Sequence, residues 1–135
     1  MALLTWNDKH SVGVKAMDGE HLGLYEAINE LYDAVLQRKD RSLTGPLLRK
    51  VEKCTRAHFA SEEAVLESTK YPELSVHRLK HQALVAEIDE LAARFEHGDV
   101  NLTGQSLNFL RYWFNAHIQN DDLSYGPWLN AHGVR

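Results

Sequence analysis

Apolar residues recur at intervals of three and four along most of the chain, and this spacing constrains the fold more than any other feature. Residues three or four apart lie on one face of an α-helix, so each such segment buries one stripe against its neighbours. Alternating strand patterns are scarce, and the sequence therefore predicts an all-α protein. The first stripe consists of Leu24, Tyr25, Ile28, Leu31, Tyr32 and Val35.

Turn-forming residues divide the chain into four helical segments. Thr44 is expected to be the N-cap of the second helix, with Pro46 in its first turn. Proline also separates the second helix from the third at Tyr71-Pro72, and Gly98-Asp99 ends the third. Gly126-Pro127 is expected to stop any continuation of the fourth. The predicted helices cover about 18–38, 45–68, 73–97 and 102–121.

Short connections between these helices predict an up-down-up-down antiparallel four-helix bundle. The length of 135 residues suits a single domain spanning 1–135. An N-terminal arm (1–17) and a short C-terminal tail (122–135) flank the bundle. They hold Trp6 and Trp128, which we expect to fold back as hydrophobic anchors.

Charge and cysteine content exclude several classes of partner and site. Lys and Arg number 15 against 19 Asp and Glu, without a basic cluster, so nucleic acid is not an expected partner. Neither a secretory signal nor a bilayer-spanning apolar run is present, which predicts a cytoplasmic protein without membrane insertion, and we expect a monomer. Cys54 is the only cysteine, so a metal here would be held by imidazole and carboxylate.

Five histidines lie at helix positions that belong to the apolar stripes. In "HRLKH" (77–81) two imidazoles lie one helical turn apart, and in "HFASE" (58–62) Glu62 follows His58 at the same spacing. A buried polar group without a partner costs about 1–3 kcal/mol, so several such imidazoles in one core require compensation. A metal ion supplies it. The five stripe histidines, drawn from all four predicted helices, are His21, His58, His77, His81 and His117.

The fourth helix offers two aspartates in "HIQNDD" (117–122). Asp121, four residues after His117, shares its face in a regular helix, whereas Asp122 lies about 140° away. A wider turn at the end of the helix would instead bring Asp122 inward. Helical geometry alone leaves both aspartates as candidates.

These segments together resemble the hemerythrins, specifically the single-domain bacterial type. The resemblance spans nearly the whole chain and rests on a first-helix His, His-x3-Glu, His-x3-His and His-x4-Asp in that order. The matching segments are "MDGEH", "HFASEE", "YPELSVHRLKH" and "HIQNDD". The family motif has four residues between its last His and Asp, which implies Asp122 as the ligand. The pattern differs from the ferritin-like Glu-x-x-His motif, which this chain lacks.

The resemblance implies a non-haem di-iron centre with a bridging oxo or hydroxo group and O2 as its ligand. By position, His77, His81 and His117 would hold one iron and His21 and His58 the other. Glu62 and Asp122 would bridge them. The implied function is reversible O2 binding for transport, storage or delivery to an oxygen-using enzyme, and not catalysis. The alternatives are an oxygen or redox sensor, or an enzyme that reduces O2, peroxide or nitric oxide.

A site that binds O2 reversibly also needs an apolar lining around the open metal position. Bulky apolar residues lie one turn after His21, next to His58 and about one to two turns before His117. The candidates for this lining are Leu24, Phe59, Phe109, Leu110 and Trp113. Glu63 is expected to be a solvated neighbour of Glu62 and not a ligand.

Overall fold

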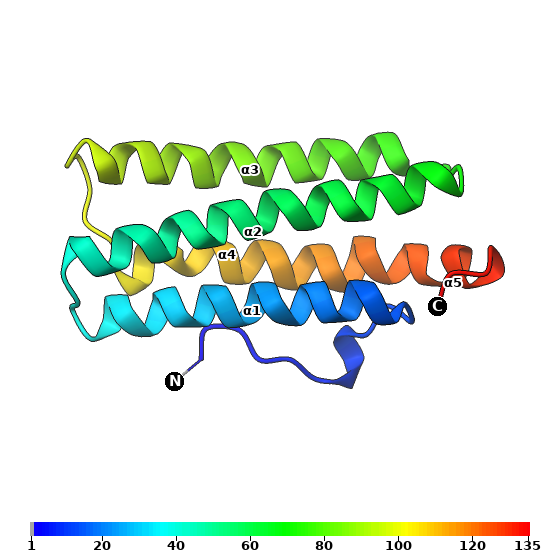
Figure 1. The fold of residues 1–135 in the computed structure, drawn as a ribbon, viewed down its shortest axis with the longest axis horizontal. Coiled ribbons are helices and arrows are strands. Elements are labelled where there is room, and N and C mark those ends of the chain that lie inside the picture. The colour runs from blue at the N-terminus through cyan, green and yellow to red at the C-terminus, as the bar shows by residue number, and fades with distance from the viewer. Residues whose placement is uncertain (1) are drawn as a thin grey trace.

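Four long helical rods lie side by side, and each turns back on the one before it (Figure 1). The computed structural model describes residues 2–135, within which no strand occurs. The expected all-α antiparallel four-helix bundle is confirmed. Its elements are a 3₁₀ turn Asp8–His10, α1 Lys15–Leu36, α2 Arg41–Ser68, α3 Leu74–Glu96, α4 Gly104–Ala116, a π-helical turn His117–Asp122 and α5 Leu123–Ala131.

The first helix is displaced toward the N-terminus relative to the expected 18–38. It starts at Lys15, and the amide of Asp18 donates to the carbonyl of Val14 at 2.9 Å. It ends at Leu36 because Arg38 adopts the left-handed region, with φ 56°. The amides after the helix then close back onto its last turn, which satisfies carbonyls that would otherwise lack partners.

The second helix starts at Arg41 and not at 45, so the prediction of Thr44 as N-cap and Pro46 in the first turn is wrong. Arg41 extends the helix because its guanidinium donates to the carbonyl of Phe95 and stacks over the Phe95 ring. Thr44 therefore lies inside the helix, where its hydroxyl donates to the carbonyl of Asp40 at 3.4 Å. Pro46 is the sixth residue of α2, so it lacks the amide hydrogen that would bond to the carbonyl of Ser42.

The fourth rod does not end at 121, and Gly126-Pro127 does not stop it. The π-helical turn and α5 continue it to Ala131, so most of the expected tail is helical. Gly126 serves a different purpose, because a Cβ there would lie 2.1 Å from the carbonyl oxygen of Val12. The glycine thus lets the N-terminal arm pass close to α5.

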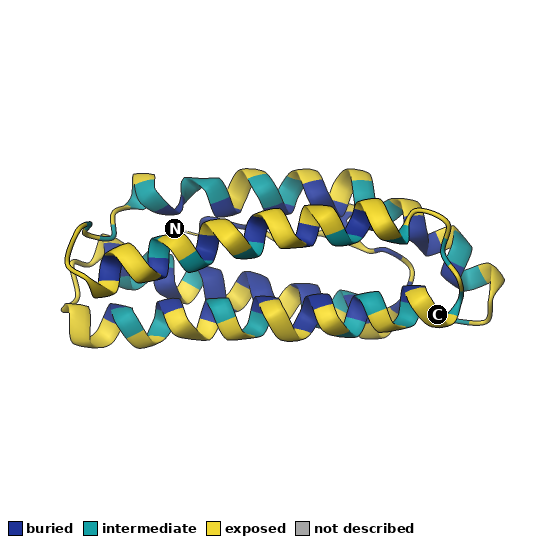
Figure 2. Cartoon of the chain, turned by 90° about the horizontal axis from the view of Figure 1, so that it is seen from above, coloured by how far each residue is buried: buried dark blue, intermediate teal, exposed yellow. Residues whose placement is uncertain are grey.

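The interior of the bundle consists of two apolar clusters, one on each side of a polar layer. Figure 2 shows buried residues recurring along the helices, alternating with exposed ones. The larger cluster is built around Leu24, Ile28, Leu84, Leu110 and Phe114. The smaller cluster contains Val12, Val14, Met17, Leu66, Tyr125 and Leu129. Between them lie the histidine and carboxylate side chains that the sequence placed on the stripes.

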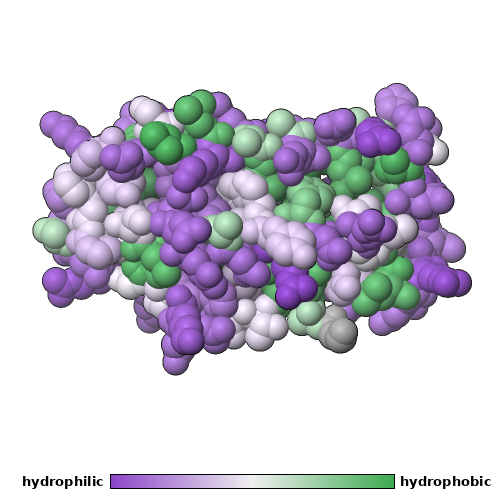
Figure 3. Space-filling view, turned by 180° about the vertical axis from the view of Figure 1, so that it is seen from behind, coloured by the Kyte–Doolittle hydropathy of each residue, from purple (hydrophilic) through white to green (hydrophobic). Residues whose placement is uncertain are grey.

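The arm and the C-terminal helix cover the bundle, as expected from their tryptophans. The amide of Leu4 donates to Asn29 at 2.9 Å, and Trp6 packs edge-on against Tyr25. Trp128 donates its indole N–H to Thr69 at 3.1 Å. Hydrophilic side chains cover much of the surface in Figure 3, and no described helix is long and apolar enough to cross a membrane.

Candidate metal centre

The seven predicted ligand side chains meet in the polar layer, and each is at most 4% exposed. Helical periodicity explains the convergence, because these residues occupy the same stripes as the apolar core. The contributors are His21 from α1, His58 and Glu62 from α2, His77 and His81 from α3, and His117 and Asp122 from the π-helical turn.

The ligand atoms form two overlapping groups, in each of which all atoms lie within 4.8 Å of one another. Glu62 and Asp122 belong to both groups. We call the first the three-histidine end, because it adds His77, His81 and His117; the second, the two-histidine end, adds His21 and His58. Two carboxylates shared between two clusters of imidazoles can bridge a pair of metal ions.

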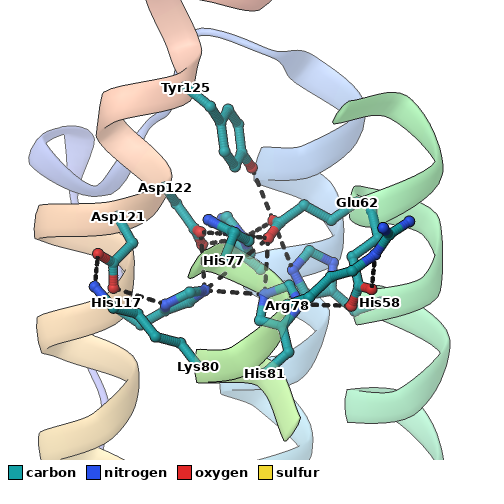
Figure 4. Close-up of polar contacts among 12 residues, drawn as sticks. His58, Glu62, His77, Arg78, Lys80, His81, His117, Asp121, Asp122 and Tyr125 are labelled. Carbon is teal, nitrogen blue, oxygen red and sulfur yellow. Dashed lines mark hydrogen bonds and ion pairs between the residues drawn. The ribbon is translucent and has the colours of Figure 1, made fainter. Parts of the chain in front are cut away.

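The π-helical turn decides between the two aspartates. Its wider spacing brings Asp122 fully inside, with Oδ1 3.0 Å from Nε2 of His117. Asp121 lies on the opposite side of the same ring, where its Oδ2 accepts from Nδ1 of His117 at 2.9 Å (Figure 4). The geometry therefore places Asp122 among the ligand atoms and Asp121 behind them.

Glu62 is the central carboxylate of the site. Its Oε1 lies 2.6 Å from Nε2 of His77, and its Oε2 accepts a hydrogen bond from the Tyr125 hydroxyl at 2.8 Å (Figure 4). Sequence reasoning missed Tyr125, because the fourth helix was expected to end before it. Only the continuation through the π-helical turn brings this phenol over the site.

Opposite charges determine the protonation of the metal-free centre. Burial alone lowers the pKa of His21 and His77, but interactions with Asp122 and Glu62 outweigh it and raise both pKa values to about 9. Burial likewise favours the neutral acid of Glu62 and Asp122, yet the surrounding imidazoles hold both carboxyl pKa values well below their usual range. The centre thus contains imidazolium and carboxylate groups at neutral pH.

Three further carboxylates hold the outer edges of the histidine rings. Glu20 accepts from Nδ1 of His58 at 2.7 Å, and Glu63 from Nδ1 of His81 at 2.8 Å; Asp121 holds His117 in the same way. Such partners fix the ring orientation and leave Nε2 to face a metal. Glu63 is accordingly more than the solvated neighbour expected from the sequence. The sequence did contain one indication of this role, because each of these three acids is adjacent in sequence to a predicted ligand.

The residues predicted to form the apolar lining fall into three groups. Phe59 stacks on the ring of His81 with 3.7 Å between centroids, and Trp113 stacks on His117 at 4.3 Å. Leu24 and Leu110 are buried in the adjoining apolar cluster. Phe109 is only partly buried and borders a surface hollow with Leu91 and Arg94 near the start of α4, not the ligand layer.

Unsatisfied polar atoms test whether a metal fits the centre. Both oxygens of Asp122 are buried without a hydrogen bond, although imidazole Nε2 atoms lie 3.0–3.1 Å away. The Nε2 atoms of His81 and His117 face each other at 3.0 Å. Buried carboxylate oxygens without hydrogen bonds, set among closely spaced imidazole Nε2 atoms, are expected of metal ligands, and imidazole with carboxylate suits iron, manganese or zinc. The residues therefore fit a metal pair.

Fold and site together define a helical-bundle protein with a buried histidine and carboxylate centre for cations. The family model described as hemerythrin HHE cation binding domain matches residues 12–129, and the chain belongs to the hemerythrin family.

Known proteins align with the chain over nearly its full length. It is 30% identical to the bacteriohemerythrin of Methylococcus capsulatus over 97% of this chain and 100% of that protein. It is also 30% identical to the bacteriohemerythrin of Stenotrophomonas maltophilia, over 98% of this chain and 85% of the relative. A crystal structure of wild-type hemerythrin superposes with a TM-score of 0.89 at 28% identity, covering 93% of this chain and 97% of that one.

Proposed function

We propose that the protein binds O2 reversibly at two iron ions held in this centre. The proposal rests on the different number of histidines in the two ligand groups. Both contain Glu62 and Asp122, but one adds three imidazoles and the other two. If both ions reach the same coordination number, the ion at His21 and His58 has room for one more ligand, as O2 binding requires.

Two ferrous ions bound here would supply the two electrons needed to bind O2, and would recover them when O2 is released. Seven side chains would hold the ions, and their burial would keep water away from them. Phe59 packs beside His58 of the two-histidine end, with 5.8 Å between ring centroids, and Leu24, one turn after His21 on α1, lies in the adjoining apolar cluster. Phe59 and Trp113 also stack against His81 and His117 of the three-histidine end. A dry pocket of this kind favours release of unreacted O2 over proton-dependent reduction.

The surrounding groups favour carriage over turnover. Burial raises the pKa of Tyr125 far above its usual value, and its hydroxyl already donates to Glu62. It is therefore a poor proton source for bound O2. Sensing and reductive chemistry at the same ions stay the alternatives. The monomeric state, the cytoplasmic location and delivery to an oxygen-using enzyme stay predictions.

Anaerobic reconstitution with ferrous iron tests the proposal. We expect about two iron ions per chain and an absorption band that appears with air and disappears under argon, over repeated cycles. Irreversible bleaching with release of hydrogen peroxide would instead identify an oxidase. A protein that retains no iron would refute the metal assignment as well.

Matched histidine and glutamate variants provide the control for iron content. Glu62→Ala removes a carboxylate shared by both ligand groups and should lower the iron content of the protein. His97→Ala removes an exposed imidazole at the end of α3 and should leave the iron content unchanged. Equal loss in both variants would contradict the assignment.

A further inference from the structure

Two basic residues lie between the paired histidines of α3 in the sequence, and neither is a metal ligand. In the segment His77–His81, the two histidines are buried, while Arg78 extends toward Glu63 of α2 and Lys80 toward Asp121 of the π-helical turn (Figure 4). The side chains of Arg78 and Lys80 are 39% and 46% exposed, respectively, so neither contributes much to the core. Both nevertheless contact the carboxylates that lie behind ligand histidines.

Lys80 is the outer end of a chain of contacts to His117. Its Nζ lies 2.5 Å from Oδ1 of Asp121, and Oδ2 of Asp121 lies 2.9 Å from Nδ1 of His117. The aspartate uses one oxygen for each partner. The charge of Lys80 is thereby connected to a buried ring through a single carboxylate.

Arg78 forms the corresponding chain to His81. Its Nε donates to Oε1 of Glu63 at 3.1 Å, while Oε2 of Glu63 accepts from Nδ1 of His81 at 2.8 Å. Arg78 also donates to Glu67 at 3.2 Å, which anchors the guanidinium along α2. Two of the imidazoles at the three-histidine end are therefore backed by a carboxylate and a cation.

The two-histidine end is arranged differently. Glu20 accepts from His58, but its other oxygen accepts from the neutral hydroxyl of Ser61 at 2.9 Å. Nδ1 of His21 is buried and has no hydrogen-bond partner among residues 2–135. Among the described residues, carboxylates that contact both a ligand histidine and a Lys or Arg side chain thus occur at the three-histidine end only.

The difference between the two ends predicts which oxidation state of a bound metal is favoured at the three-histidine end. A carboxylate that accepts the Nδ1 proton makes the imidazole a stronger electron donor, which favours the higher charge of an oxidised metal. A cation on the other carboxylate oxygen withdraws part of that negative charge and opposes the effect. A neutral hydroxyl opposes it less.

We infer that Lys80 and Arg78 are positioning residues that raise the reduction potential of the three-histidine end, acting through Asp121 and Glu63 on His117 and His81. The inference rests on the proposed function, since it concerns the same metal pair. It assigns a role to the two basic residues that the ligand motif leaves unexplained. A higher potential would help the ferrous state persist between rounds of O2 binding.

Midpoint potentials of the iron-loaded protein, measured by spectroelectrochemistry, test the inference. Lys80→Met should lower the potential by about 30–60 mV, a three- to tenfold change in the ferrous-to-ferric ratio at 59 mV per tenfold. Asp121→Asn should raise the midpoint potential, and Lys80→Arg, which keeps the positive charge, should leave it at the wild-type value. Lys50→Met is the matched control, because Lys50 is 52% exposed and its one ion pair within residues 2–135 is with the exposed Glu30 at 3.4 Å.

The double variant separates an effect through the imidazole from a general charge effect. If Lys80 acts through Asp121, Lys80→Met should change the potential by less than half as much in the Asp121→Asn background. Full additivity, or shifts of the same sign in the two single variants, would overturn the inference.

Cobalt(II) binding provides a readout that needs neither iron nor O2. Competition with a chelator should show several-fold tighter binding in Lys80→Met and about ten- to a hundredfold weaker binding in Asp121→Asn. Equal affinities across these variants would also refute the inference. If wild-type protein binds iron and O2 reversibly while the variants match it, only this inference fails; if wild-type protein holds no iron pair, the proposed function fails first.

Discussion

Metal uptake by the metal-free protein should release protons from the buried histidines. His21 and His77 have pKa values raised to about 9, so at pH 7 both are imidazolium. A metal ion needs the neutral ring, and each ring must lose its proton before it can bind. We therefore expect at least two protons released per protein at pH 7, with His58, whose pKa is also raised, as a further source.

The size of the effect follows from the two pKa values of about 9. Removing a proton from each ring at pH 7 costs about 2.7 kcal/mol, or about 5 kcal/mol for the pair, at 1.36 kcal/mol per unit. The apparent affinity should therefore rise by about a hundredfold per pH unit between pH 7 and 9, and level off above it.

Zinc titration of the metal-free protein in a weakly buffered solution with an indicator dye measures the released protons. The count should fall toward zero as the starting pH is raised from 7 to 9.5. Protons lost from metal-bound water would increase with pH instead, so the sign of the trend separates the two sources. Release that is constant or grows with pH would refute the assigned protonation states.

Three further predictions concern the stability of the metal-free protein. The pKa values of Glu62 and Asp122 are lowered by folding, so these carboxylates stabilise the fold above about pH 5, and their stabilisation is lost on acidification. The pKa values of His21 and His77 are raised by folding, so these imidazoles stabilise the fold below about pH 6.5, and their stabilisation is lost as the pH rises through 9. Urea unfolding should therefore show a maximum between pH 5 and 6.5, and a maximum near pH 9 would contradict it. Gly126→Ala should destabilise by about 1–3 kcal/mol because its Cβ meets the Val12 carbonyl, whereas Gly23→Ala, with nothing within 4 Å, should stabilise by about 0.5–1 kcal/mol. Tyr125→Phe should cost about 1–3 kcal/mol in thermal unfolding, since it leaves the buried Glu62 without its phenol donor, and an unchanged melting temperature would dismiss that hydrogen bond.

The parts of the fold that follow from one helix's own periodicity were predictable. His58 with Glu62 and His77 with His81 lie one turn apart on buried stripes, and the structure brings them together. Contacts between different helices could not be predicted from the periodicity of a single helix. The pairing of Glu20 with His58 depends on how α1 and α2 pack, and no spacing along a single helix encodes it.

The end of the fourth rod shows why local signals failed there. Gly126-Pro127 has the composition of a helix stop, but the glycine is required by a contact with Val12, more than a hundred residues earlier in the chain. Regular helical geometry also favoured Asp121 over Asp122, and only the π-helical turn reverses that order. Tyr125 and the second apolar cluster depend on the same turn.

The widened turn also has an entropic consequence for His117. It directs two successive aspartates to opposite edges of one ring: Asp121 contacts Nδ1 at 2.9 Å, and Asp122 lies 3.0 Å from Nε2. The ring is thus held in its final rotamer before any ion arrives. Freezing a side chain on binding costs about 0.5–1.5 kcal/mol, and here that loss is incurred during folding. The bulge in the backbone therefore preorganises a ligand as well as supplying one.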